Sequence, residues 1–196
     1  MRLTKRGEYG LRTMIRLGVA ARMGQAVQSV SQLAEQERLP FKFLEQILAE
    51  LRLAGYVESV RGKHGGAKLA RPAEKITMGE IVRLIDGKLA PIGCASETEY
   101  EPCSCPDEAH CGLRMLMIDV RNAIANILDR YTLSQVVEVT IRKLERDNLP
   151  LPFVKVEAKN APQWVAPGSG PRRSDPSDGF LALLMDPTIL CAEPED

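Results

Sequence analysis

The chain has 196 residues, of which 44% are hydrophobic and 27% charged, the composition of a soluble globular protein with one substantial core. Aromatic residues make up only 5%, which argues against the stacking platforms that bind single-stranded nucleic acids. No apolar run approaches the ~20 residues needed to span a membrane, and residues 1–6 lead into no secretory signal. We therefore expect a cytoplasmic protein without a membrane partner, in a compartment where thiols are kept reduced.

The net charge of zero hides an asymmetry between the two halves of the chain. Residues 1–90 hold 16 Lys and Arg against 9 Asp and Glu, whereas residues 91–196 hold 10 against 17. A basic half joined to an acidic half favours a polyanionic partner for the first half. Chance segregation of surface charge would give the same numbers, so charge alone leaves both readings open.

Two helices are predicted near the N-terminus. Thr4 can cap the first helix, which should end near Gly24. Ser31 would cap a shorter second helix over residues 32–37. The first helix has apolar positions that recur at helical spacing: Leu11, Met14, Ile15, Gly18 and Val19.

A third helix should follow a turn at residues 38–40. Pro40 suits the start of a helix, and Gly55 suits the position just after its end. One face of this helix is apolar: Leu44, Ile47, Leu48 and Leu51. A short helix, a tight turn and a second helix with one buried face are typical of a helix-turn-helix.

A β-hairpin is predicted directly after the third helix. Residues 56–60 and 67–70 read as two strands joined by a basic, glycine-rich turn at 61–66. Such a hairpin is the wing of a winged helix, and its cations suit phosphates or a narrow minor groove. The glycines do not indicate a P-loop, because no Gly-Lys-Ser/Thr opens a helix here.

A capped helix and a long amphipathic helix follow. Thr77 and Glu80 form a capping box, and the helix should end at residues 86–87. The long helix begins near Gly112, and Thr132 would cap a further helix after it. A long apolar stripe beside a small domain favours packing against a second subunit. The stripe consists of Leu113, Leu116, Met117, Val120, Ile124, Ile127, Leu128 and Tyr131.

Four cysteines crowd the loop before the long helix, in the pattern C-x8-C-x-C-x5-C: Cys94, Cys103, Cys105 and Cys111. Gathered thiolates can hold a metal ion or an iron–sulfur cluster, or pair as disulfides. The spacing lacks the C-x2-C knuckles typical of zinc sites, and the acidic loop offers no cation to lower a thiol pKa. Cys191 stands alone in a proline-rich segment that we expect to be disordered.

The order of these motifs resembles the winged-helix iron–sulfur transcription regulators of the IscR and NsrR type. The resemblance spans roughly residues 1–145 and leaves out the segment after them. It is carried by Met-Arg-Leu-Thr at the start, Phe43-Leu44-Glu45-Gln46, Ser59-Val60-Arg61-Gly62, Gly65-Gly66, Ile76-Thr77-Met78-Gly79-Glu80-Ile81, Cys111-Gly112-Leu113-Arg114 and Tyr131-Thr132-Leu133.

The resemblance implies a homodimer with one [2Fe-2S] or [4Fe-4S] cluster per subunit. The family pattern of three cysteine ligands fits Cys94, Cys105 and Cys111, with Cys103 as the alternative ligand. In several members a fourth ligand comes from the first helix of the partner, at the position of Glu8 here.

The chain departs from one family pattern at residue 114. Some members ligate the cluster through a histidine three residues after the last cysteine, and Arg114 stands there. A guanidinium cannot serve as that ligand, which puts a Cys3His site in doubt. Glu8 or Cys103 is then the expected fourth ligand.

A DNA-binding surface is expected on the third helix and the wing. Glu45 and Gln46 can read base edges, Gln46 by bridging adenine and Glu45 by accepting from cytosine. Arg61 can reach a base or the minor groove. The full expected surface comprises Lys42, Phe43, Glu45, Gln46, Arg61, Lys63, His64 and Lys68, with the lysines on phosphates.

These expectations combine into a mainly α fold with a small β-hairpin. It comprises a winged helix-turn-helix over residues 1–90, a cysteine cluster-binding loop over 91–111, a dimerisation helix and short helix over 112–148, and a disordered tail over 149–196.

The function we expect is a dimeric DNA-binding regulator, a repressor, switched by a cluster that senses redox state, nitric oxide or iron supply. The alternatives are a cluster-free thiol-redox regulator and an iron–sulfur electron carrier. No catalytic triad, Walker motif or dinucleotide fingerprint suggests an enzyme.

Overall fold

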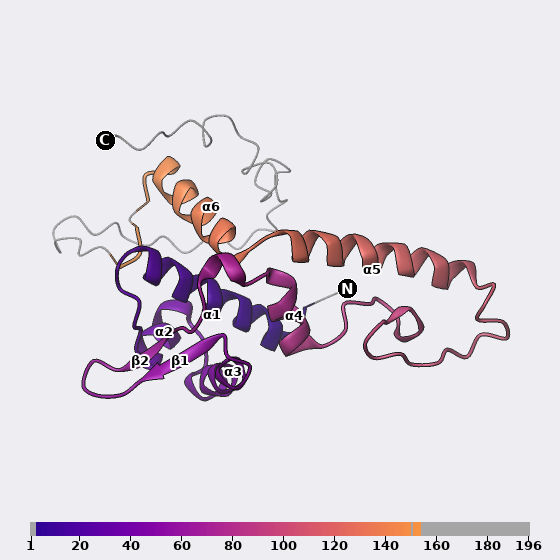
Figure 1. Ribbon diagram of the computed structural model, residues 1–196, viewed down its shortest axis with the longest axis horizontal. Helices are drawn as coiled ribbons and strands as arrows, with labels where there is room; N and C mark the ends of the chain where they lie inside the picture. Colours follow the sequence, from indigo (N-terminus) through magenta and orange to yellow (C-terminus); the bar gives the residue numbers. More distant parts are fainter. Residues whose placement is uncertain (1–2, 150, 154–196) are drawn as a thin grey trace. The chain divides into compact units, whose positions relative to one another are not determined.

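The computed structural model describes residues 3–149 and 151–153, so Cys191 and nearly all of the predicted disordered tail lie outside the described residues. The chain divides into two compact units, residues 1–134 and 135–196. The elements are α1 (Lys5–Arg22), α2 (Val30–Glu37), α3 (Phe41–Leu53), β1 (Val57–Val60), β2 (Gly66–Leu69), η1 (Ala73–Lys75), α4 (Met78–Asp86), η2 (Gly93–Ala95), α5 (Gly112–Arg130) and α6 (Leu133–Arg146). The first nine of them belong to the first unit. Figure 1 labels the principal elements in chain order.

The first helix is capped as predicted, but the second begins earlier than expected. The Thr4 hydroxyl accepts a hydrogen bond from the Gly7 amide at 3.0 Å, and α1 ends at Arg22. In α2 the cap is Ser29 and not Ser31, because Ser29 is extended and its hydroxyl accepts from the Gln32 amide at 3.2 Å. Ser31 lies inside the first turn, where its side chain does not cap the helix.

The third helix and its buried face agree with the sequence prediction. Pro40 is the cap residue of α3, and Gly55 has a φ of 73° just after its end, a conformation that costs glycine little. The four apolar residues predicted on one face are at most 7% exposed. They pack beside the fully buried Met14 and Leu17 of α1 and Leu33 of α2, so α1, α2 and α3 share one core.

The predicted hairpin is present and is tied to the helix-turn-helix. β1 and β2 pair antiparallel, with Val57 opposite Leu69. Gln28, directly before the α2 cap, exchanges two backbone hydrogen bonds with Ala67 of β2, at 2.9 and 2.8 Å. Figure 1 shows the hairpin beside α2 and α3. This backbone bridge fixes the wing relative to the helices of the same unit.

The fourth helix is joined to the C-terminal end of α5. Its capping box at Thr77 and Glu80 is present, and the Met78 amide donates to the Tyr131 carbonyl at 3.0 Å. Arg83 of α4 forms a bidentate pair with Asp129 of α5, with both distances 2.6 Å. These bonds connect α4 to the C-terminal end of α5.

The predicted long helix spans α5, and its apolar stripe is largely open. No residue of α5 is buried, and Leu116 and Ile127 are 56% and 51% exposed. Tyr131, predicted as the last residue of the stripe, is instead the C-cap residue after α5 and is only 7% exposed. No helix among the described residues is long and apolar enough to cross a membrane.

Truncation of Ile81 should destabilise the first unit. Its side chain is fully buried in α4, so Ile81→Ala should lower the free energy of unfolding by about 2–5 kcal/mol. Leu53→Ala, at an 88% exposed site, is the control and should stay within about 0.5 kcal/mol of the parent. Chemical denaturation measures both, and equal losses would contradict the core placement of Ile81.

Candidate functional site

All four cysteines of the predicted loop line one pocket. Cys94, in η2, is 5% exposed, whereas Cys105 is exposed and Cys103 and Cys111 are half-buried. The other lining residues are Ile92, Gly93, Glu101, Pro102 and Leu113. All four thiols are free. The structure therefore brings together four thiols that span 18 residues of sequence.

A backbone hydrogen bond brings residues 93 and 101 of the loop side by side. The Glu101 amide donates to the Gly93 carbonyl at 3.2 Å, and the Ser96 amide donates to the same carbonyl at 3.0 Å. Gly93 is pressed so closely against the Glu101 side chain that a Cβ there would clash with it. This closure places the Cys94 segment next to the segment that carries Cys103.

Arg114 holds the cysteine loop from α5. Its Nε donates to the Cys94 carbonyl at 3.0 Å and lies 3.2 Å from Glu108 Oε1. The other Glu108 oxygen accepts from the Tyr100 hydroxyl at 2.7 Å and from the Cys103 thiol at 3.7 Å. The residue that replaces the family histidine thus connects three segments of the loop.

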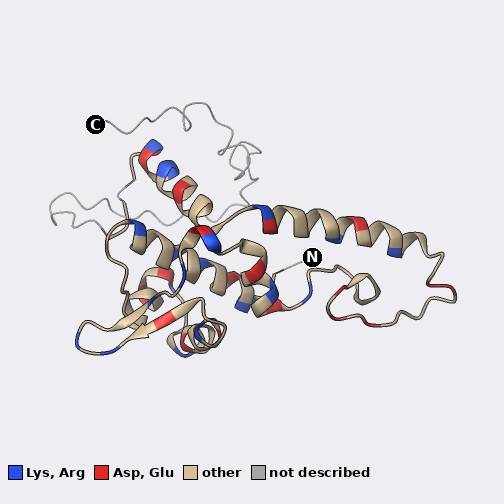
Figure 2. Cartoon of the chain, viewed as in Figure 1, with Lys and Arg blue, Asp and Glu red and all other residues tan. Residues whose placement is uncertain are grey.

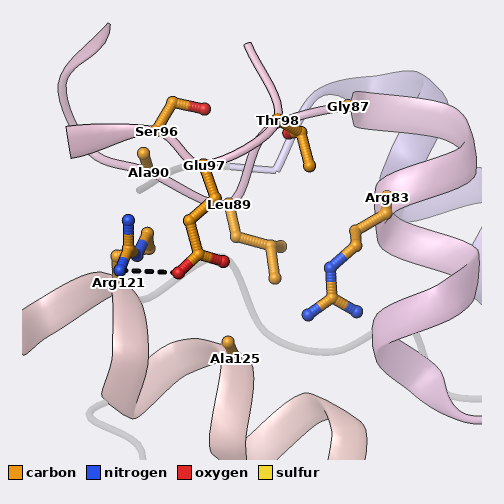
Figure 3. Close-up of a pocket in the computed structure, with 9 residues that line it drawn as sticks. All are labelled: Arg83, Gly87, Leu89, Ala90, Ser96, Glu97, Thr98, Arg121 and Ala125. Carbon is orange, nitrogen blue, oxygen red and sulfur yellow. Dashed lines mark ion pairs between the residues drawn. The ribbon is translucent and has the colours of Figure 1, made fainter. Parts of the chain in front are cut away.

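A second arginine of α5, Arg121, holds the same turn. It donates to the Ala95 carbonyl at 2.7 Å and pairs with Glu97 at 2.9 Å. Figure 3 shows Arg121 of α5 and Arg83 of α4 lining one small pocket, with Glu97 against Arg121. Sequence analysis missed the roles of Arg114, Arg121 and Glu108. The seven-residue spacing of the two arginines, two helical turns, was the one available signal.

The surroundings of the thiols shift their pKa values in opposite directions. Burial, with Cys103 next to it, raises the pKa of Cys94. A hydrogen bond with Cys103, reinforced by Cys111, raises the pKa of Cys105 to about 12. The backbone amide of Arg114 lowers the pKa of Cys111, which stands at the cap position of α5. Cys111 is therefore the thiol best prepared to act as a thiolate ligand.

The donor set suits an iron–sulfur cluster in its chemistry, since thiolates are the usual ligands. Within residues 3–149 and 151–153, no three Cys, His, Asp or Glu side chains are gathered as they would be around a metal ion. The four thiols line the pocket without converging on one point, so the loop would have to close around a bound group. His110 pairs with Asp107 at 2.7 Å and does not line the pocket.

Glu8 lies on the first turn of α1 and does not line the cysteine pocket. Its carboxylate pairs with Lys5 at 2.8 Å and Arg12 at 3.7 Å. The hydrogen bond from Lys5 is the main reason why its pKa is lowered. Glu8 is therefore held as a carboxylate, and its role as a ligand from a partner subunit stays a prediction.

The predicted DNA-contact residues fall on α3 and the hairpin. On α3, Lys42, Glu45 and Gln46 are exposed, while half-buried Phe43 packs edge-on against Tyr9 at 5.7 Å. Arg61, Lys63 and His64 are exposed in the turn between the strands. Figure 2 shows this turn rich in Lys and Arg.

Lys68 differs from the other cations of the hairpin. It lies on β2, and its ammonium group pairs with Glu58 of β1 at 2.6 Å. A phosphate would have to compete with that carboxylate, so Lys68 is the weakest member of the predicted surface.

Comparison with known proteins decides the family. The model of the Rrf2 family, described as iron-dependent transcriptional regulators, matches residues 3–139. The chain belongs to the Rrf2 family. Members are named as transcriptional regulators, so this protein is a winged-helix transcriptional regulator and not an enzyme.

The chain is similar to regulators of this family that carry different names, among them NsrR, CymR and IscR. NsrR of Bacillus licheniformis is 30% identical over 146 residues, 74% of this chain and 99% of that protein. The structure of CymR, titled the global cysteine regulator of B. subtilis, is 31% identical with a TM-score of 0.58, and covers 70% of this chain and 96% of CymR. IscR of T. potens is 26% identical with a TM-score of 0.54, over 80% and 94%. These likenesses confirm the resemblance inferred from the motifs and the winged-helix fold.

Removal of the Arg114 side chain should loosen the loop. Arg114→Ala leaves the Cys94 carbonyl and Glu108 without their shared donor, so amide hydrogens of residues 93–103 should exchange faster with solvent. Hydrogen exchange followed by mass spectrometry measures the change in cluster-free protein. Arg130→Ala, at the other end of α5, is the control, and unchanged exchange in Arg114→Ala would show that Arg114 does not hold the loop.

Proposed function

We propose that this Rrf2 protein is a homodimeric repressor, acting on DNA in the cytoplasm, whose DNA affinity is switched by an iron–sulfur cluster. The observation that carries the proposal is the shared pocket of four thiols, tied through Arg114 and Arg121 to the helix that follows it. The cluster would be [2Fe-2S] or [4Fe-4S], and it would sense redox state, nitric oxide or iron supply.

The cluster would be held by Cys94, Cys105 and Cys111. The lowered pKa of Cys111 supports its role as a ligand, and Glu8 of the partner would supply the fourth ligand. Cys103 lines the same pocket and is the same-chain alternative. A carboxylate ligand is more easily displaced than a thiolate, which suits a cluster that must respond to its surroundings.

The dimer would form through α5. Its exposed apolar residues continue into an apolar groove lined by α1, α4 and α5 within the first unit. The lining residues are Leu3, Leu11, Val82, Ile124, Ile127 and Leu128. A helix with an apolar stripe that its own chain leaves open favours pairing with the same helix in a second copy.

The switch would work by moving the two recognition helices relative to each other. Two copies of α3 reach successive major grooves only at one separation. A cluster that joins the loop of one subunit to α1 of the other would set that separation, and its loss or alteration would change it.

DNA affinity should depend on α3 in two different ways. With a site selected from a random duplex library, Gln46→Ala should weaken binding by about 1–3 kcal/mol at one base position. Lys42→Ala should weaken binding to all sequences alike and reduce the salt slope by about 1. Fluorescence anisotropy at several salt concentrations measures both.

Lys75→Ala, an exposed lysine of η1 outside α3 and the hairpin, is the matched control for these variants. Absence of any salt-sensitive binding, whether or not the protein contains a cluster, would refute the regulator.

The cysteine variants should separate ligands from bystanders. In protein purified without oxygen, Cys94→Ala, Cys105→Ala and Cys111→Ala should each abolish visible absorbance together with bound iron and sulfide. Cys103→Ala should retain all three, as should the control Cys191→Ala. Loss of absorbance in Cys103→Ala alone would show that Cys103 is a ligand and that the assignment of the other three is wrong.

A cluster-free thiol regulator is the second candidate. It is favoured by the four free thiols that line one pocket. Iron and sulfide analysis separates the two, because a thiol regulator would bind DNA with neither present. The electron-carrier alternative would leave α3 and the basic hairpin turn without a role.

A further inference from the structure

Cys103 is the one cysteine of the pocket that the proposed cluster does not need. Its thiol has two neighbours in the pocket, Cys94 and Cys105, and the bond from the Glu101 amide to the Gly93 carbonyl brings the Cys94 segment beside it. Both thiols line the same pocket, and the two side chains interact directly. The spare thiol therefore faces a thiol assigned as a cluster ligand.

The two thiols differ in access to solvent. Cys94 is 5% exposed, and its segment is fixed by the Arg114 bond to its carbonyl. Cys103 is half-buried, and its thiol is directed toward the Glu108 carboxylate at 3.7 Å. Of these two thiols, Cys103 is the more accessible to a small oxidant, and Cys94 is held beside it as the second thiol.

We propose that Cys94 and Cys103 form a disulfide when the cluster-free protein meets a peroxide. The Cys103 thiol is oxidised by hydrogen peroxide to a sulfenic acid, and one water is released. The Cys94 sulfur then attacks the Cys103 sulfur, forming the S–S bond and releasing a second water. Two thiols lose two electrons and two protons, and one peroxide becomes two waters.

The disulfide would make cluster loss persistent. Cys94 cannot ligate iron while it is bonded to Cys103, so the oxidised protein should accept a new cluster only after reduction. This consequence rests on the proposed cluster function, whereas the disulfide itself does not, because it forms between two thiols of the cluster-free chain.

The disulfide can be located by peptide mapping in a Cys191→Ser background. Trypsin leaves all four loop cysteines on residues 89–114, so further cleavage after glutamate is needed to separate Cys94 from the segment that carries Cys103 and Cys105. After one equivalent of peroxide and alkylation of the remaining thiols, we expect a crosslink between those two fragments, which dithiothreitol should remove. Circular dichroism of each variant checks that it is folded.

Two matched variants decide which thiol is the partner. The crosslink to Cys94 should persist in Cys105→Ser and disappear in Cys103→Ser. Its persistence in Cys103→Ser, or a dominant bond between Cys105 and Cys111, would overturn the proposal.

Reconstitution with iron and sulfide tests the consequence. Oxidised parent protein should regain less than a tenth of the visible absorbance of the reduced protein, and dithiothreitol should restore it, while peroxide-treated Cys103→Ser should need no reductant. Full recovery of the crosslinked protein without reductant would overturn the blocking role. Failure of the reduced parent to take up a cluster would instead refute the proposed function, and leave the mapped disulfide standing.

Discussion

The arrangement of the cysteine loop depends on two arginines that donate from α5 to backbone carbonyls. A long irregular segment has few partners of its own for its peptide groups, and unpaired peptide groups are costly where water is excluded. Arg114 and Arg121 supply donors to the consecutive carbonyls of Cys94 and Ala95. The Arg121 side chain is only 13% exposed, so its bonds are poorly screened by solvent. The position of the most buried thiol is thereby set by a helix and not by the thiol itself.

The same helix continues this support to the DNA-binding part of the first unit. Asp129 near the end of α5 pairs with Arg83 of α4, and Asp86 at the end of α4 accepts from the backbone amide and hydroxyl of Thr4. Thr4 is the cap of α1, the helix whose first turn carries Glu8. Polar contacts therefore run from the cysteine loop through α5 and α4 to the start of α1, which gives the proposed switch a physical route.

Whether a feature could be predicted from the sequence depended on how far apart its interacting residues lie along the chain. The buried face of α3, the Thr77 capping box and the end of α3 at Gly55 are local and periodic, so residue spacing was sufficient. The predicted cap of α2 was wrong because Ser29 and Ser31 both belong to a residue type that caps helices well. Only the backbone conformation shows that Ser29 is the cap. Arg114 could be recognised from the sequence as a missing histidine, but its bond to Cys94 joins residues twenty positions apart, which no local pattern reveals.

The bonds that fix the loop join arginine side chains, peptide groups and carboxylates. The Cys103 thiol takes part only through its long contact with Glu108. The carbonyls of Gly93, Cys94 and Ala95 are all engaged, whereas the sulfur atoms remain available to one another or to a cluster. Chemistry at sulfur can therefore change without removing the contacts that hold η2 against α5. In that case a change at the sulfur atoms would act by shifting the later part of the loop, around residues 103–111, and not by unfolding the whole segment. Such a displacement would act on α5 through the contacts that the loop already makes with it. A switch between two packed arrangements requires contacts of this kind.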